Sequence, residues 1–239
     1  MKVQIFVPCY IDQFYPQTAQ NTVEILERVG CEVIYNPNQT CCGQPAFNSG
    51  YWKETLYLAE KFFNDFSLEM PIVSPSGSCA GFIKKHYHKL FANDAEKLAL
   101  CNKIASNIFE LSDFLVNQLH IEDVGATFSH KITFHESCSA LREYGIKEEP
   151  FKLLSHVKGL ELIPMEESTT CCGFGGTFSV KYTDISSAMV EKKVRHAIAT
   201  GAEFIVSTEA SCLMNINGYL IKHKLPMRGI HLADILNSK

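Results

Sequence analysis

The chain contains 239 residues, of which 46% are hydrophobic and 20% charged, and its formal net charge is −4. This composition is ordinary for a globular protein with a sizeable core. An acidic balance without any run of basic residues argues against a nucleic-acid partner, which needs a basic face. No segment approaches the ~18 apolar residues of a membrane span, and the apolar run at 5–7 ends at Pro8, too short for a secretion signal. We therefore expect a cytoplasmic protein.

The first half of the chain alternates between short strand-like runs and longer helical stripes. Apolar residues three or four positions apart indicate helices, and short β-branched runs indicate strands. The predicted strands are 2–7, 32–35 and 71–75, and the predicted helices are 17–29, 52–66, 81–90 and 93–120. Residues 76–79 are expected to form a loop of small residues before the helix at 81–90.

The second half repeats this order. Its predicted strands are 131–134, 160–163 and 204–206, and its predicted helices are 150–157, 185–199 and 213–221. Alternating strands and helices indicate parallel sheets covered by helices. The expected fold is therefore α/β, with two similar pseudo-repeated lobes, each a small and mostly parallel sheet flanked by helices. We place the first lobe at residues 1–122 and the second at 123–239.

Eight of the ten cysteines form two matched quartets built around a repeated Cys-Cys-Gly. Their spacings are C-x31-CC-x36-C and C-x32-CC-x39-C. The first quartet is Cys9, Cys41, Cys42 and Cys79, and the second is Cys138, Cys171, Cys172 and Cys212. Each of these cysteines follows a predicted strand or begins a helix, and sites in open α/β sheets form at the carboxyl ends of strands. We therefore expect each lobe to gather one quartet around one metal centre.

Three kinds of chemistry remain open for these thiols. Iron–sulfur clusters take four thiolates from loops that allow close approach of backbone amides, which the glycines after each Cys-Cys pair permit. Zinc is the alternative, although structural zinc sites usually contain short C-x2-4-C steps that this chain lacks. A redox disulfide between neighbouring cysteines is the third possibility. Cys31 and Cys101 lie outside both quartets and are predicted to be buried inert thiols.

Few other residues stand out. His135 and Glu136 lie close to Cys138 and are candidates to donate a hydrogen bond to a ligand sulfur or to relay protons. A partly exposed loop histidine without such a role is the simpler prediction. The glycines at 173–176 lack the spacing and the strand-to-helix context of a dinucleotide-binding turn, and nothing in the sequence indicates a flavin.

The two quartets resemble the cysteine-rich CCG domain of heterodisulfide reductase and related iron–sulfur oxidoreductases, over essentially the whole chain. The segments 75–79, 135–138, 171–181 and 207–213 are similar to the lactate-utilisation branch of that family. The resemblance implies an electron-carrying oxidoreductase subunit that acts with two partner subunits, one of them ferredoxin-like, in the oxidation of L-lactate to pyruvate. It also implies that the eight quartet cysteines bind one or two iron–sulfur clusters, with zinc as the alternative.

The chain departs from the family pattern at one point in each half. The full pattern ends in C-x-x-C, but Phe82 and Asn215 stand where the fifth cysteine of each domain would be. Four thiolates per lobe suit an ordinary [4Fe–4S] cluster as well as a noncubane one. The departure weakens one alternative function, a thiol–disulfide reductase subunit of the heterodisulfide type, and leaves a second, a zinc-binding scaffold subunit, unaffected. No catalytic residue outside the cysteines is identified by its spacing.

Overall fold

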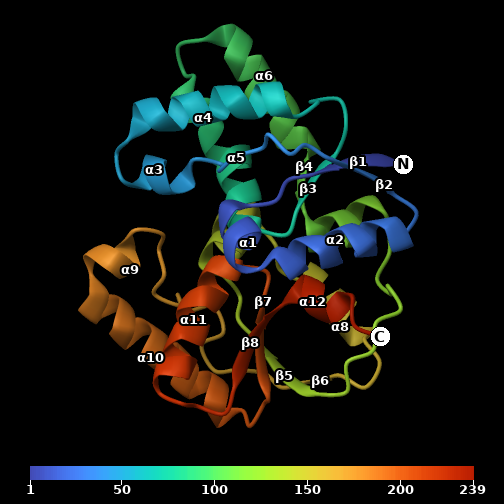
Figure 1. Cartoon of the computed structure of the whole chain (residues 1–239), viewed down its shortest axis with the longest axis vertical. Coiled ribbons are helices and arrows are strands. Elements are labelled where there is room, and N and C mark those ends of the chain that lie inside the picture. The colour runs from blue at the N-terminus through green and yellow to red at the C-terminus, as the bar shows by residue number, and fades with distance from the viewer.

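The computed structural model describes all residues, 1–239, as two four-stranded sheets in which every strand pair is parallel (Figure 1). The first sheet has the order β2-β1-β3-β4 and the second the order β6-β5-β7-β8, so the two halves share one topology. The strands of the first sheet are β1 (Lys2–Ile5), β2 (Glu32–Tyr35), β3 (Ile72–Ser74) and β4 (Ile108–Glu110). Those of the second are β5 (Lys131–Phe134), β6 (Glu161–Leu162), β7 (Phe204–Ser207) and β8 (Arg228–His231). The predicted pair of α/β lobes is confirmed.

The helices of the first half flank its sheet. They are α1 (Cys9–Phe14), α2 (Pro16–Arg28), α3 (Gln44–Asn48), α4 (Trp52–Asp65), α5 (Gly77–Leu90), α6 (Ala95–Asn107), α7 (Leu111–Asp113) and the π-helical turn η1 (Phe114–Gln118). Helix α2 begins with a proline, whose missing N–H costs nothing at that position. It ends before Gly30, whose φ of +86° a residue with a side chain rarely adopts.

The helices of the second half are arranged in the same way. They are η2 (Ala140–Tyr144), α8 (Glu149–Ser155), α9 (Phe178–Lys181), α10 (Thr183–Ala199), α11 (Ala210–Lys222) and α12 (Leu232–Leu236). No helix combines the length and apolar character that crossing a bilayer requires.

The prediction of one long helix over 93–120 is wrong. Helix α6 ends at Asn107, and the chain then enters the sheet as β4, where Ile108 and Phe109 pair with Ile72 and Val73 of β3. The corresponding strand of the second half, β8, is absent from the predicted elements. Both strands are too short for alternation to show, and their leucine- and isoleucine-rich surroundings fit a helical period equally well. Pairing within the sheet decides their conformation.

Helices α5 and α11 begin earlier than predicted, so Cys79 and Cys212 lie in their first turns and not in preceding loops. The Ser76 hydroxyl caps α5 by accepting a hydrogen bond from the backbone N–H of Cys79 at 3.3 Å. The last cysteine of each quartet is therefore held by a helix N-terminus.

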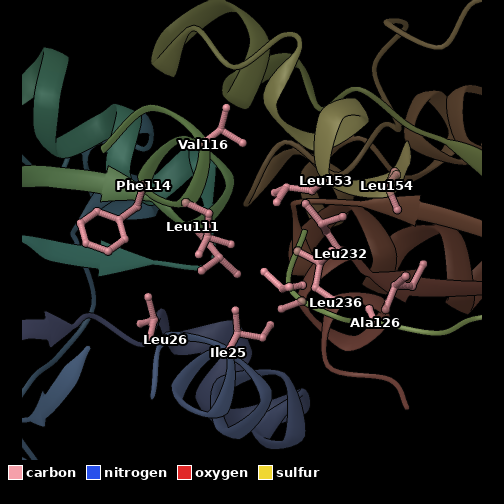
Figure 2. Close-up of a cluster of buried hydrophobic side chains, with 14 of the residues drawn as sticks. Ile25, Leu26, Leu111, Phe114, Val116, Ala126, Leu153, Leu154, Leu232 and Leu236 are labelled. Atoms are coloured by element: carbon pink, nitrogen blue, oxygen red, sulfur yellow. The ribbon is translucent and has the colours of Figure 1, made fainter. Parts of the chain in front are cut away.

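The two halves share a hydrophobic core. Figure 2 shows Ile25 and Leu26 of α2, together with Leu111, in one cluster of buried side chains. The same cluster contains Leu153, Leu232 and Leu236 of the second half. Helices α2 and α12, far apart in sequence, lie side by side (Figure 1). Each half also has a core of its own. Because residues of both halves exclude water together, we expect them to unfold together. The boundary between residues 122 and 123 stays a prediction.

Glu110 makes this shared region sensitive to pH. Its carboxylate accepts hydrogen bonds from the backbone N–H groups of Ser112 and Asp113 at 2.7 and 3.3 Å. It is nevertheless fully buried, and burial raises the pKa of Glu110 to about 8. A carboxyl whose pKa is higher in the folded state stabilises the fold below its unfolded pKa and loses that contribution as pH rises through the folded value.

We therefore expect the free energy of unfolding to fall as the pH is raised from about 4.5 to about 8, by up to about 1.4 kcal/mol per pH unit from this group. Urea denaturation at several pH values measures the slope. Glu110→Gln should flatten it, because the amide does not titrate. A slope unchanged in that variant would show that another group is responsible.

Candidate metal centre

All eight cysteines of the two quartets line a single cavity of about 120 Å³. The cavity lies where the carboxyl ends of β1, β3, β5 and β7 and the residues after them meet. Cys9 and Cys138 follow β1 and β5, and Cys79 and Cys212 lie at the starts of α5 and α11. The sequence predicted one quartet per lobe but not that both would line the same cavity, because the packing of one lobe on the other brings them together.

The first quartet gathers two close pairs of sulfur atoms. The Sγ atoms of Cys9 and Cys41 are 3.7 Å apart, and those of Cys42 and Cys79 are 3.4 Å apart. The backbone N–H of Gly43 donates to the Cys41 sulfur at 3.4 Å. Gly43 has a φ of +92°, which residues with a side chain rarely adopt, so the backbone conformation after the cysteines favours glycine.

The second quartet is built in the same way. The backbone N–H of Gly173 donates to the Cys171 sulfur at 3.4 Å. The sulfurs of Cys172 and Cys212 and a ring nitrogen of His135 all lie within 4.8 Å of one another. The Cys212 thiol also faces the Ser137 hydroxyl at 3.8 Å. Both quartets therefore present sulfur atoms together with a glycine N–H.

The cysteines of each quartet are too close together and too buried for all of their thiols to ionise at once. Hydrogen bonds from Cys42 and Cys9 lower the pKa of Cys41. Hydrogen bonding to Cys41 and burial raise the pKa of Cys9, and the pKa of Cys42 is raised by Cys41, Cys79 and burial. Hydrogen bonding to Cys171 and burial likewise raise the pKa of Cys138. Thiols crowded in this way need a bound cation before all of them can ionise.

The donor set fits a metal or an iron–sulfur cluster. All ten cysteines are free thiols, so no disulfide consumes the quartets. Helix N-termini and amide groups lie beside the sulfurs, as an anionic thiolate centre requires. The protein ligands of such a centre would be the eight cysteines named above, and that role stays a prediction. Cys31 and Cys101 do not line the cavity and are buried in hydrophobic cores, as expected.

The residues at the two missing cysteine positions have structural roles of different kinds. Phe82 is 1% exposed and stacks with His86 in the core of the first half. Asn215 donates from its side chain to the carbonyl oxygen of Cys172 at 2.9 Å. In the first half the Tyr87 hydroxyl makes the equivalent contact, donating to the carbonyl of Cys42 at 2.9 Å. Neither position provides a further sulfur ligand.

The prediction that His135 is a partly exposed loop residue is wrong. His135 is fully buried, because it directly follows β5 and still pairs with β7 through its backbone N–H and the Val206 carbonyl. Glu136 accepts a hydrogen bond from the Ser168 hydroxyl at 2.6 Å and does not line the cavity. Strand alternation places His135 on the face of Lys131 and Thr133, so it did not indicate burial. Thr133 and His135 are both buried because this face of the parallel sheet is covered as well.

Glu209 is the site residue that the sequence did not reveal. It lines the cavity and is 1% exposed. Its carboxylate accepts hydrogen bonds from the other half of the molecule: from the backbone N–H and the hydroxyl of Ser78 at 2.5 and 2.8 Å, and from the Ser76 hydroxyl at 3.1 Å. Burial raises the pKa of Glu209. The carboxylate thus joins the start of α11 to the start of α5, next to the last cysteine of each quartet.

Gly173 is expected to tolerate no side chain. It has a φ of +86°, and an added Cβ would lie 2.7 Å from the backbone oxygen of Ser186 and 3.0 Å from Met189. Gly173→Ala should therefore lower the free energy of unfolding by about 2 kcal/mol more than Gly176→Ala, which also has a positive φ but open space around it. Chemical denaturation of both variants measures the difference. Equal effects would mean that the close approach to Ser186 is unimportant.

Comparison with known proteins agrees with this arrangement. The family model described as CCG, cysteine-rich domain, matches residues 3–84 and again residues 132–217. The chain is similar to lactate utilization protein A of Geobacillus kaustophilus (44% identical), of Bacillus subtilis (45%) and of Shouchella clausii (47%). In each case the similarity spans 239 residues and covers 100% of both proteins.

A solved structure shares the fold at low sequence identity. It is a hypothetical protein from Helicobacter pylori, with a TM-score of 0.65 and 12% identity, and the similarity covers 98% of this chain and 48% of that one. At this identity only the fold is shared. With its cysteine-rich domain found twice and relatives about 45% identical over their full length, this chain belongs to the CCG cysteine-rich-domain family and, within it, to the family of lactate utilization protein A.

Proposed function

We propose that this chain is a cytoplasmic iron–sulfur electron-transfer subunit of a multi-protein complex that oxidises L-lactate to pyruvate. The observation that carries the proposal is the convergence of eight free cysteines, in two quartets, on one cavity. The names of the full-length relatives support lactate as the substrate of the system. Oxidation of a hydroxy acid to a keto acid releases an electron pair, and an iron–sulfur cluster bound here would supply one-electron storage.

Iron–sulfur clusters suit the quartets better than zinc does. The adjacent pairs Cys41-Cys42 and Cys171-Cys172 have backbone amides of the following glycine directed at the first sulfur. Such amide–sulfur hydrogen bonds tune clusters. A cluster offers separate irons to adjacent thiolates, whereas one tetrahedral zinc ion does not. The N-termini of α5 and α11, at Cys79 and Cys212, add favourable dipoles for an anionic group.

Lactate itself is expected to bind on another subunit. Tight recognition of a carboxylate substrate usually relies on a cationic side chain. No lysine, arginine or histidine lines the cavity, and the carboxylate there, Glu209, would repel an anion. We therefore assign substrate oxidation to one of two partner subunits and the onward transfer of electrons to a ferredoxin-like partner. The residues of this chain hold the centres.

The test is anaerobic purification followed by reconstitution with iron and sulfide. We expect iron and acid-labile sulfide in the multiples of a [4Fe–4S] cluster, and an EPR signal after reduction. Co-expression with the partner subunits should yield a complex that reduces an electron acceptor with L-lactate. Absence of iron after anaerobic reconstitution would overturn the proposal, and stoichiometric zinc without visible absorbance would support the scaffold alternative.

One observation favours a second function. Cys41 lines the cavity, is partly exposed and is adjacent to Cys42, and hydrogen bonds lower its pKa, as a thiol–disulfide reductase subunit requires. Cleavage of a disulfide substrate by the isolated chain with an artificial electron donor would support that function over electron transfer. A chain without such activity but with reducible clusters would support the first.

A further inference from the structure

A buried histidine lies beside the second quartet with one ring nitrogen unused. His135 Nδ1 contacts the backbone carbonyl oxygen of Ser168 at 3.3 Å, while Nε2 is buried and has no hydrogen-bond partner. Because a carbonyl oxygen only accepts, the proton of the neutral ring belongs on Nδ1. Nε2 is then an unprotonated nitrogen with a free lone pair, the form in which histidine binds metals.

Lys193 keeps the ring in this form. Its ammonium group, 2% exposed, donates to the same Ser168 carbonyl at 3.0 Å and to the Glu167 carbonyl at 2.6 Å. A positive charge beside the buried ring disfavours a second proton on it, in agreement with the Nδ1 contact that leaves Nε2 unprotonated. The same two carbonyls belong to the loop that leads to Cys171.

The geometry places the ring where a ligand would be. The donor atoms of His135, Cys172 and Cys212 lie within 4.8 Å of one another, and all three residues are buried. Ligands on one tetrahedral metal are separated by distances below this limit, given metal–sulfur bonds of ~2.3 Å and metal–nitrogen bonds of ~2.0 Å. A metal bound between these three donor atoms would account for the lack of a hydrogen-bond partner at Nε2.

The first half provides an internal control. Phe6 follows β1 as His135 follows β5, and each lies the same distance before the first cysteine of its quartet. Phe62 of α4 takes the place of Lys193 of α10. The packing of Gly43 on Thr55 and of Gly173 on Ser186 sets this correspondence. Phe6 and Phe62 are buried and meet edge to face, with ring centroids 5.1 Å apart. The aromatic pair of one half is thus replaced by an imidazole and an ammonium group in the other.

We propose that His135 is a ligand of the second-half centre, bound through Nε2 beside Cys172 and Cys212, and that the first-half centre is bound by thiolates alone. This proposal rests on the proposed function, since it requires a metal or cluster in the second half. The imidazole adds a ligand without adding negative charge, and the Lys193 ammonium group adds a positive charge that the first half lacks. A nearby positive charge raises a reduction potential. The second centre is therefore the more readily reduced of the two.

The experiment uses the full-length chain labelled with ¹⁵N-histidine and reconstituted anaerobically. Cys42→Ala empties the first half, so that the remaining signal comes from the second centre alone. Pulsed EPR of the reduced protein should show a strongly coupled histidine nitrogen that changes with the isotope. His135→Phe, which copies the first half, should lose this coupling. The matched control His130→Gln should keep it, because His130 is half-exposed and is paired with Glu203.

The outcomes separate the two proposals. A cluster in the second half without strong histidine coupling, or with coupling that survives in His135→Phe, overturns the ligand assignment and leaves the proposed function intact. Absence of any metal from the second half overturns the ligand assignment, and the proposed function is overturned as well only if the unmodified chain also contains no iron. If that half contains zinc, zinc-edge X-ray absorption replaces EPR: one imidazole among sulfur ligands supports the assignment, and a sulfur-only shell contradicts it. The labelled chain with an intact His135 answers the question even if His135→Phe fails to fold.

Discussion

Replacing Cys42 with alanine is expected to remove the metal of the first half, and replacing Cys172 is expected to remove that of the second. Each single variant should retain about half of the iron of the unmodified chain, and the double variant should retain almost none. These two positions are chosen because they are the most buried members of the adjacent pairs, each 2% exposed. Loss of one thiolate from a set of four leaves an iron without its protein ligand. Iron and sulfide analysis after anaerobic reconstitution measures the result.

The design also distinguishes two centres from one shared centre. All eight cysteines line one cavity, so a single cluster that draws ligands from both halves is a geometric alternative. In that case either single variant would lose all of its iron. Cys31→Ala and Cys101→Ala are the matched controls, because both remove a buried free thiol that does not line the cavity. They should retain full iron content. Loss of iron from these controls would mean that the losses reflect damage to the fold.

Glu209→Ala is expected to destabilise the chain by about 3 kcal/mol, the largest effect that we predict for a residue other than the cysteines. The change removes the buried acceptor of three hydrogen bonds, which come from the backbone N–H and the hydroxyl of Ser78 and from the hydroxyl of Ser76. It also opens a void between α5 and α11. Because the carboxylate connects the two halves, we expect the loss to appear in one cooperative transition. Urea denaturation of the metal-free, reduced chain measures it.

Two comparisons make the Glu209 prediction specific. Glu209→Gln keeps one acceptor oxygen and the shape of the side chain, so its loss should be smaller than that of Glu209→Ala. Glu166→Ala removes an exposed carboxylate of the second half, 83% accessible, and should change stability by less than about 0.5 kcal/mol. If Glu209→Ala were as mild as Glu166→Ala, the contact between the halves would not depend on this carboxylate.

Local patterns were sufficient for most of the elements. The strands at 32–35 and 131–134 have the predicted bounds, and the helices at 17–29, 52–66 and 185–199 differ from α2, α4 and α10 by at most two residues at either end. Each of these has either a clear apolar stripe or a β-branched run. The errors concern the short helices α1, α3, α9 and α12, which were not predicted, and above all β4 and β8, which are short strands beside helices. A period cannot be read from so few residues, and only their neighbour in the sheet makes them extended.

The sequence by itself determined the type and number of the candidate ligands and their division between two α/β lobes, because spacing, periodicity and thiol chemistry are local properties. Only the tertiary structure decided that the quartets share one cavity, that Glu209 links α5 to α11, and that His135 lies inside beside Cys172. These features depend on how the two lobes pack together and on which faces of the strands are covered by the rest of the chain. The sequence pattern of a histidine after a strand is the same whether water or a thiolate lies next to its side chain.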